Sequence, residues 1–463
     1  MNKATIYYQD IGDYLSRDEK LAVIKKNRSI ANMQWQNLTP NEHGDWLNQR
    51  NDVFGSLISL APEKKYNLNE NSFFITYSLG IVSARDAWVY NFSKTKLKNN
   101  IRKTIDYYNK QMNLLLKNEI IEVQKKSSEG NWTRDWENQI KRRHSIIENI
   151  EEYRITLHRP FTRQNNYFDD DLNQERYQLP KIFPTEKHKN LIISITGVGS
   201  SKDFSILITD EIPDYQVMMN GQCFPLYYYE ESDTQNANLF DANNKEKYIR
   251  RDAISDFILE RCRTNYGIST SLNNHQKLSK EDIFYYVYGV LHSPQYRETF
   301  AADLKKMLPR LPLVDEPKDF WSFSKAGRDL ADLHLNYETI EPYRGVRIIY
   351  GAGNDVNYRV EKMRFAKDGK ESDKTKIIYN HQITLENIPL AAYEYVVNGK
   401  SAIEWIMERY AITPHKESGI TNDPNDWATE TGKPKYILDL LQSIINVSVQ
   451  TVEIVKGLPE LIF

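Results

Sequence analysis

"DIFYYVYGVLHSPQYRETFAADLKKMLPRLPL" (residues 282–313) joins an apolar, tyrosine-rich run to a short basic segment interrupted by prolines. Ser279 and Asp282 have the spacing of a capping box, which predicts that a helix begins there. Ser293 followed by Pro294 is typical of an N-cap and the first turn of a second helix. The stretch therefore predicts two successive helices, an aromatic one and then a helix that ends in positive charge.

The tyrosines of this stretch allow two interpretations. They occupy neighbouring positions, so they do not all lie on one face of a helix. One interpretation is a core helix or a seam between domains. The other is a surface that lies against nucleic acid. Buried aromatic rings usually serve packing and satisfy their hydroxyl groups internally. The packing interpretation is therefore favoured for Tyr285, Tyr286 and Tyr288.

Length and charge limit the classes of function. A chain of 463 residues is long enough for at least two cores. Its 61 basic and 63 acidic residues give a net charge of −2, so binding to nucleic acid must depend on a local patch. The two cysteines, Cys223 and Cys262, indicate free thiols in a reducing cytoplasm. No run approaches the roughly 18 apolar residues of a membrane span, so no membrane association is expected.

The N-terminal half predicts a short strand at residues 3–8 and a helix capped by Ser16 and Glu19. A strand-like run follows at residues 72–93. Periodic apolar residues then predict two antiparallel helices within residues 94–158.

The C-terminal half begins after an extended connector at residues 159–184. A glycine turn between two β-rich runs predicts a hairpin within residues 190–214. Residues 344–385 contain further strand-like runs, and closing helices are expected at residues 399–412 and 434–455.

Motifs for several common reactions are absent. The chain contains no GxxxxGK[ST] phosphate loop, no HExxH, no paired CxxC and no GxSxG. Its nine histidines do not cluster at ligand spacing. "GVGSSK" (residues 197–202) follows a strand and fits no nucleotide fingerprint, because a strand, not a helix, is expected after it. It is interpreted as a hairpin turn, with contact to a DNA phosphate as the alternative.

Local basic groups are the candidates for contact with DNA phosphates. Any one of them is more often a solvated face, because phosphate binding needs several cations that converge. Arginines next to aromatic rings at residues 85–92 and 159–169 allow either stacking on a base or capping of carbonyl groups between domains. The predicted DNA contacts are Lys94, Lys96, Arg102, Arg163, Lys202, Arg250, Arg251, Lys305, Lys306 and Arg310.

Several stretches together resemble the carboxy-terminal part of type ISP restriction–modification enzymes. These enzymes combine a nuclease, a helicase-like translocase, an adenine methyltransferase and a target-recognition domain in one polypeptide. The similarity extends in order over essentially the whole chain. It is carried by "LHRPFTRQNNYFDDDLNQERYQLPKIFP", "TGVGSSKDFSILITDEIPD", "QCFPLYYYE", "YYVYGVLHSPQYRETFAADLKKMLPRLPL", "FWSFSKAGRDLADLHLNYE", "YEYVVNGKSAIEWIMERY" and "NDPNDW".

The resemblance implies a mixed α/β (α+β) fold in three parts. Residues 1–95 would be the last strands of a methyltransferase-like sheet, and residues 96–170 a helical hairpin spacer with a connector. Residues 171–463 would be the target-recognition domain. The family's glycine-rich cofactor motif and its N-P-P-Y motif are absent here. No cofactor is therefore expected in this chain, and S-adenosylmethionine, ATP and Mg²⁺ are expected only for the upstream domains.

Three functional hypotheses follow. The first is a cytoplasmic module of a restriction–modification and phage-defence system that recognises a sequence in double-stranded DNA and catalyses nothing alone. The second is one half of a split N6-adenine methyltransferase, completed by a separate catalytic polypeptide. The third is an idle remnant of a broken gene.

Overall fold

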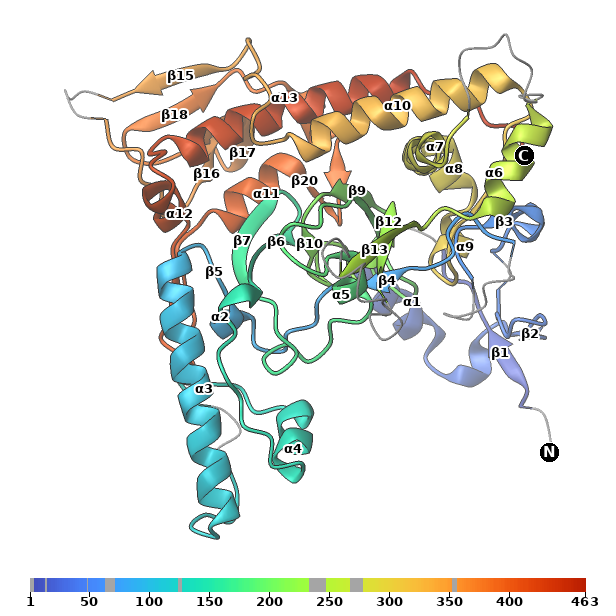
Figure 1. Ribbon diagram of the computed structural model, residues 1–463. Coiled ribbons are helices and arrows are strands. Elements are labelled where there is room, and N and C mark those ends of the chain that lie inside the picture. Colours follow the sequence, from blue (N-terminus) through green and yellow to red (C-terminus); the bar gives the residue numbers. More distant parts are fainter. Residues whose placement is uncertain are drawn as a thin grey trace, which may run out of the picture. The chain divides into compact units, whose positions relative to one another are not determined.

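The computed structural model describes residues 4–12, 15–47, 49–62, 71–123, 127–232, 247–266, 278–351 and 356–463 (Figure 1). The chain divides into two compact units, Met1–Asp52 and Val53–Phe463. The predicted boundaries after residues 95 and 170 lie inside the second unit and stay predictions.

The first unit is small and built around one antiparallel strand pair. Ser16 and Glu19 form the predicted capping box at the start of its helix, so this prediction is confirmed. None of the residues of that helix is buried. The described elements of the unit are β1 (Ile6–Tyr8), α1 (Arg17–Asn27), the 3₁₀ helix η1 (Ile30–Asn32) and β2 (Gln36–Leu38), with β1 paired to β2.

The second unit contains many short strands. They are β3 (Ile58–Ser59), β4 (Ser78–Leu79), β5 (Tyr90–Asn91), β6 (Tyr153–Arg159), β7 (Thr162–Tyr167), β8 (Ile192–Ile195), β9 (Ile206–Thr209), β10 (Ile212–Pro213), β11 (Gln222–Pro225), β12 (Tyr227–Glu231), β13 (Tyr248–Asp252), β14 (Arg310–Leu311), β15 (Arg347–Tyr350), β16 (Arg364–Asp368), β17 (Glu371–Ile378), β18 (Ile383–Glu386), β19 (Val396–Val397), β20 (Lys400–Ser401), β21 (Thr413–Pro414) and β22 (Thr421–Asn422). Among the described strands, the four-stranded sheets have the orders β10-β6-β7-β5, β4-β11-β8-β9 and β15-β18-β17-β16.

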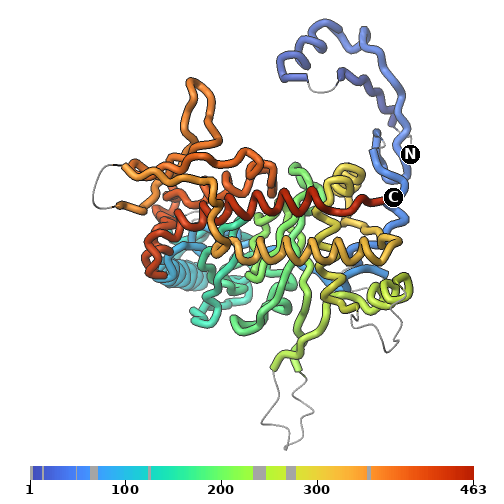
Figure 2. Tube along the Cα trace, turned by 90° about the horizontal axis from the view of Figure 1, so that it is seen from above, coloured from blue at the N-terminus to red at the C-terminus, as the bar shows by residue number. Residues whose placement is uncertain are grey.

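Helices surround and join these sheets. They are the 3₁₀ helix η2 (Asp52–Ser56), α2 (Asp86–Val89), α3 (Lys94–Leu116), α4 (Arg134–Lys141), the 3₁₀ helix η3 (Ile150–Glu152), α5 (Leu179–Ile182), α6 (Asp256–Asn265), α7 (Lys280–His292), α8 (Pro294–Thr299), α9 (Ala301–Leu304), α10 (Pro317–Leu335), the 3₁₀ helix η5 (Leu390–Tyr393), α11 (Ala402–Arg409), α12 (Pro424–Glu430) and α13 (Tyr436–Lys456). The long helices α10 and α13 lie side by side in both views (Figures 1 and 2).

The tyrosine-rich helix α7 is the centre of one hydrophobic core. Tyr285, Tyr286 and Tyr288 are all buried in it, which confirms the packing interpretation. The hydroxyl groups of two of them have hydrogen-bond partners: Tyr286 donates to Pro312 O at 2.9 Å, and Tyr288 accepts from Ile208 N at 3.1 Å. The three tyrosines therefore pack α7 against the chain around it and do not form an exposed surface.

Helix α13 belongs to a second core, formed with α11 and the β15–β18 sheet. It is long and apolar enough to cross a membrane by length and composition alone. More than half of the most apolar 18-residue stretch of this helix is buried inside the protein, including Leu441, Ile444 and Ile445 at 0% exposure. The helix is thus accounted for by core packing.

Two local predictions are wrong. The second helix expected within residues 94–158 ends early: α4 has eight residues, and the chain then enters strand β6. The expected connector at residues 159–184 contains β7 and α5. The physical reason is that β6 and β7 pair with each other and with distant strands, and such pairing overrides local helix spacing. The hairpin of β8 and β9 and the closing helices α11 and α13 are confirmed.

Candidate nucleic-acid interface

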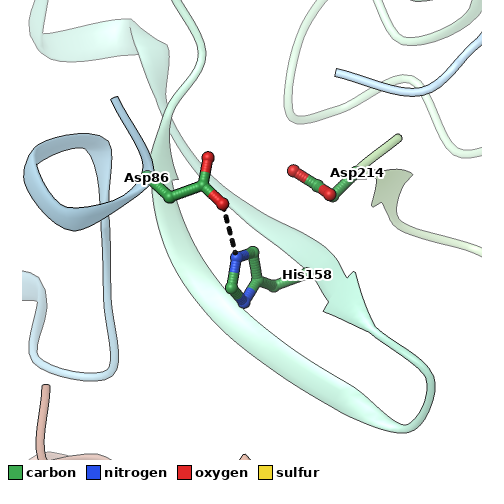
Figure 3. Close-up of side chains that lie close together, drawn as sticks. All are labelled: Asp86, His158 and Asp214. Atoms are coloured by element: carbon green, nitrogen blue, oxygen red, sulfur yellow. Dashed lines mark ion pairs between the residues drawn. The ribbon is translucent and has the colours of Figure 1, made fainter. Parts of the chain in front are cut away.

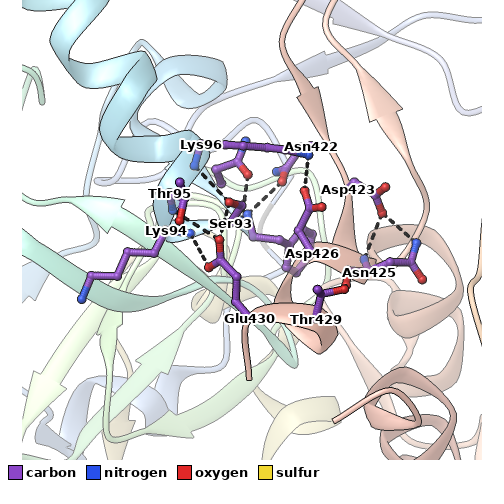
Figure 4. A network of polar contacts seen from close by, with 12 residues as sticks. Ser93, Lys94, Thr95, Lys96, Asn422, Asp423, Asn425, Asp426, Thr429 and Glu430 are labelled. Atoms are coloured by element: carbon purple, nitrogen blue, oxygen red, sulfur yellow. Dashed lines mark hydrogen bonds and ion pairs between the residues drawn. The ribbon is translucent and has the colours of Figure 1, made fainter. Parts of the chain in front are cut away.

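The N-terminus of α3 carries two predicted phosphate contacts and is capped by an acidic side chain from α12 (Figure 4). The Glu430 carboxylate accepts hydrogen bonds from Ser93 Oγ at 2.6 Å and from Lys94 N at 2.8 Å. Partial burial opposes ionisation, but these hydrogen bonds outweigh it and lower the pKa of Glu430. Lys96 Nζ lies 2.6 Å from an Asp426 oxygen. The helix amides are thus occupied by the protein's own carboxylate, while the exposed Lys94 ammonium group has no partner among the described residues.

The glycine turn after β8 brings two further predicted contacts together. Gly199 N donates to Lys305 O at 2.9 Å. Lys305 Nζ lies 3.3 Å from Asp203, a nearly fully exposed carboxylate. Lys202 is also exposed, beside Gly399, where a Cβ would come within 3.2 Å of its Nζ. Exposed ion pairs contribute little, so both ammonium groups are available to a stronger anion.

The β12–β13 ribbon presents two neighbouring arginines. The Arg250 guanidinium lies over the Tyr227 ring at 4.3 Å from its centre. Arg251 Nε pairs with a Glu230 carboxylate oxygen at 3.0 Å, and both side chains are about half exposed. The ribbon thus holds cations at the surface, one of them stacked on an aromatic ring.

Arg102 and Lys306 are exposed as well. On the surface of α3, Arg102 Nε lies 2.9 Å from a Glu148 oxygen. Lys306 follows Lys305 and continues the positive charge at the end of α9.

Two of the predicted contacts are used inside the protein. Arg163 is only 18% exposed and pairs with Asp210 at 3.0 Å and Glu338 at 3.5 Å. Arg310 donates to Leu57 O at 2.9 Å and so clamps β14 to the segment before β3. Of the ten predicted residues, these two are the least available to phosphate.

The arginine at the start of α2 caps carbonyl groups. Arg85 is fully buried, donates to Asn131 O at 2.9 Å and pairs with Asp135 at 2.9 Å. Trp88 and Tyr90 in the same segment are buried too. For this segment the capping alternative is confirmed, and its rings are not available to stack on a base.

A partly buried ionic network, with Asp86 at its exposed side, lies between α2, β6 and the end of β10 (Figure 3). Ligand atoms of Asp86, His158 and Asp214 all lie within 4.8 Å of one another. Arg159 bridges the two carboxylates, at 3.2 Å from Asp86 and 2.8 Å from Asp214, and Tyr90 donates to Asp214 at 2.9 Å. Burial raises the pKa of Asp214 to about 7 and lowers that of His158 to about 4. Arg159 supplies the positive charge that two close carboxylates need, so the cluster is explained as a structural network.

One group of cations was missed from the sequence. Residues 344–386 hold nine basic and six acidic residues in a chain whose overall charge is slightly negative. The basic residues are spread along separate strands, whereas the sequence reasoning looked for adjacent cations. The missed group is Arg344, Arg347, Arg359, Lys362, Arg364, Lys367, Lys370, Lys374 and Lys376, most of them exposed.

Comparison with known proteins gives a consistent picture. Residues 72–440 match the family model described as the type ISP C-terminal specificity domain. No curated protein matches the chain.

Three solved structures similar to this chain are DNA complexes. The chain is 37% identical to the ATP-dependent type ISP restriction–modification enzyme LlaBIII bound to DNA, over 99% of this chain and 28% of that one, with a TM-score of 0.83. It is 36% identical to a nuclease-deletion mutant of the type ISP enzyme LlaGI in complex with a DNA substrate mimic, over 99% of this chain and 39% of that one, with a TM-score of 0.82. A DrdV–DNA complex is 27% identical, over 98% of this chain and 43% of that one, with a TM-score of 0.81. The chain thus spans less than half the length of each of these proteins.

Proposed function

The chain belongs to the family of type ISP C-terminal specificity domains, and on this premise we propose that it recognises a sequence in duplex DNA. One observation carries the proposal: 99% of the chain superposes on part of an enzyme bound to DNA, at 37% identity. At that identity over that length, the elements that lie against DNA in a relative have counterparts here.

The exposed cations support a mode of binding in which phosphate contacts set position and base-edge contacts set sequence. Several of the predicted side chains lie at the surface in pairs, which is what contact with successive phosphates requires. The proposed phosphate contacts are Lys94, Lys202, Arg250, Arg251, Lys305 and Lys306.

The proposal contains recognition and no covalent step. Type ISP enzymes use an N-P-P-Y motif for methylation and a phosphate-loop motif for ATP-driven translocation. This sequence has neither motif. Any methylation or cleavage would be supplied by other polypeptide, with its own S-adenosylmethionine, ATP and Mg²⁺.

Selection from a random duplex library, followed by affinity measurement at ~50 and ~200 mM salt, tests the proposal. We expect enrichment of one sequence and a loss of affinity of about a hundredfold between the two salt concentrations if four phosphates are contacted. No enrichment, together with no salt dependence, would contradict it.

The first unit favours a second candidate function, that of a subunit completed by a catalytic methyltransferase polypeptide. Met1–Asp52 exposes large apolar side chains: Tyr7 is 59% exposed, Ile24 56% and Trp46 59%. Its described sheet consists of β1 and β2 alone, and isolated two-stranded ribbons are marginal in water. An apolar surface and a strand pair with no further strand among the described residues together suit addition to a partner's sheet.

Co-purification tests this second candidate. The full chain would be expressed with a polypeptide that contains an N-P-P-Y motif from the same restriction–modification locus. We expect a stable complex that is lost when Tyr7 and Trp46 are replaced by Ser. A complex that survives the double substitution, or no complex at all, would contradict the role given to this unit.

A further inference from the structure

We propose that the β15–β18–β17–β16 sheet is a second phosphate-contacting surface for duplex DNA, with Lys362 and Arg364 as its principal contacts. The assignment rests on the proposed function and adds a surface that no predicted contact touches. Three features of the sheet support it: two chemically different faces, unpaired cations and a cavity at one end.

The two faces of this sheet differ in chemistry. Ile377, Ile383 and Leu385 are fully buried in the second core, so alternate residues must point away from it. In the observed register Arg364 pairs with Ile378, one residue beyond the buried Ile377, and therefore lies on the outward face. The outward face thus carries positive charge over a rigid, well-packed base.

Part of the outward charge is neutralised within the sheet, and part is not. Arg347 and Lys376 both pair with Glu386, at 2.7 and 3.2 Å. Five exposed cations of residues 344–376 have no ion-pair or hydrogen-bond partner for their side chains among the described residues, and they are Arg344, Lys362, Arg364, Lys367 and Lys370. Unpaired cations on a supported surface are the groups that gain most from a phosphate.

The cations at one end of the sheet surround a cavity of about 250 Å³. Lys362, Arg364 and His381 line it, and none of the three side chains has a partner among the described residues. One carboxylate, that of the exposed Glu361, lines it as well. Arg359 also lines it but is held by Asp423 at 2.7 Å. The cavity is large enough for a phosphate group, since a water molecule occupies about 30 Å³ of liquid.

The Asn380 side chain ties together two segments that line this cavity. Asn380 donates to Asn357 O at 2.7 Å and to Arg359 O at 3.0 Å. Its oxygen accepts from Gln382 N and Ile383 N, both at 2.8 Å. The loop before β16 is therefore tied to the turn between β17 and β18, and the free cations project from a fixed frame.

The β16–β17 hairpin carries two further exposed lysines. Its two-residue turn begins at Gly369, whose φ of +60° suits a tight hairpin turn. Lys370 lies in that turn and Lys367 two residues before it, and both are exposed beside the acidic Asp368 and Glu371. Cations at both the cavity and the hairpin tip match a duplex, in which phosphates recur along the strand, better than they match a single small anion.

The test compares salt dependence in matched variants of the full chain. K362Q/R364Q removes two charges from the cavity, and K367E/K370E changes only the hairpin tip, where folding is not at risk. K117Q/K318Q removes two charges from exposed sites, one at the end of α3 and one on α10, whose side chains have no ion-pair partner among the described residues, and it serves as the control.

We expect the slope of log affinity against log salt to fall by about 1–2 in K362Q/R364Q and in K367E/K370E, since each lost phosphate contact removes about 0.9. The selected DNA sequence should stay the same, and the control should retain the wild-type slope. An unchanged slope in both test variants overturns this assignment alone. A wild-type chain that binds no duplex overturns the proposed function and the assignment with it.

Discussion

Gly289 of α7 and Gly327 of α10 lie against each other where the two helices cross. A Cβ on Gly289 would lie 2.2 Å from Phe323 O, and a Cβ on Gly327 would lie 1.9 Å from Tyr285 O. No side chain fits between the two backbones. The tyrosine-rich stretch thus decides the fold partly through its one glycine, which lets α7 contact α10 directly.

Replacing either glycine with alanine should destabilise the protein. G289A and G327A each force the helices apart, and overpacking of this kind costs about 1–3 kcal/mol, more than alanine gains in helix propensity. Chemical denaturation measures the difference. G55A is the control, because a Cβ there meets nothing within 4 Å, and it should be neutral or slightly stabilising. Equal stability of G289A and G55A would contradict the close crossing.

The Glu430 cap on α3 predicts a second stability effect. In E430Q an amide N–H₂ replaces one oxygen that accepts from Ser93 or from the α3 backbone. Loss of a charged cap should lower the free energy of unfolding by about 1–2 kcal/mol. Denaturant midpoints at constant m-value give the measurement. E119Q, at an exposed glutamate beyond the end of α3, is the control and should leave the midpoint unchanged.

A buried histidine predicts a specific dependence of stability on pH. His334 lies between the Tyr288 hydroxyl at 2.6 Å and Thr451 Oγ1 at 2.9 Å, and burial lowers its pKa to about 3. Its ordinary pKa is 6.5. The unfolded chain therefore takes up a proton that the folded chain refuses, and the contribution of His334 is complete above pH 6.5 and is lost as the pH falls towards 3.

H334Q isolates this contribution. The variant should be less stable than the wild type at pH 7. The difference in free energy of unfolding between the two should narrow as the pH falls from 7 to 4, because only the wild type loses the stability linked to His334. Unfolding curves at several pH values measure the gap. A constant gap for H334Q would show that His334 is not held neutral.

The two cysteines predict a chemical readout of folding. Cys223 and Cys262 are 1% and 0% exposed, and burial raises the pKa of each thiol to about 12. Alkylation needs the thiolate, so the native chain should add no iodoacetamide at pH 8, while the denatured chain should add two. Intact-mass measurement gives the count. Rapid modification of the native protein would contradict the burial of these thiols.

Local signals were readable from the sequence. The helices that begin after Ser16 and Ser279 were predicted at their start, because a capping box is formed by residues three apart. Strand β6 was mistaken for helix, because what decides it is pairing with β7 and with the distant Ile212, in a parallel register with Thr156. Pairing at that separation leaves no signal in a short window.

The candidate interface was only partly readable for the same reason. The sequence shows each cation but not the carboxylate that neutralises it. Lys202 and Lys305 are about a hundred residues apart and meet through the glycine turn, whereas Arg163 meets Asp210 and Glu338. The missed cations of residues 344–386 lie on or next to the strands of one four-stranded sheet, which no run of adjacent charges indicates.

The predicted DNA contacts should therefore separate into two sets by experiment. K202Q/K305Q changes exposed side chains whose one ion pair among the described residues, between Lys305 and Asp203, is at the surface. We expect the free energy of unfolding to stay within about 0.5 kcal/mol of the wild-type value. The slope of log affinity for DNA against log salt should fall by about 2. R163Q breaks two partly buried ion pairs and should lower the free energy of unfolding by about 1–3 kcal/mol with the salt slope unchanged. Affinity measurements and denaturation of the same samples decide both. If R163Q lowers the slope and K202Q/K305Q does not, then the internal pairs open on binding and the glycine turn lies away from the DNA.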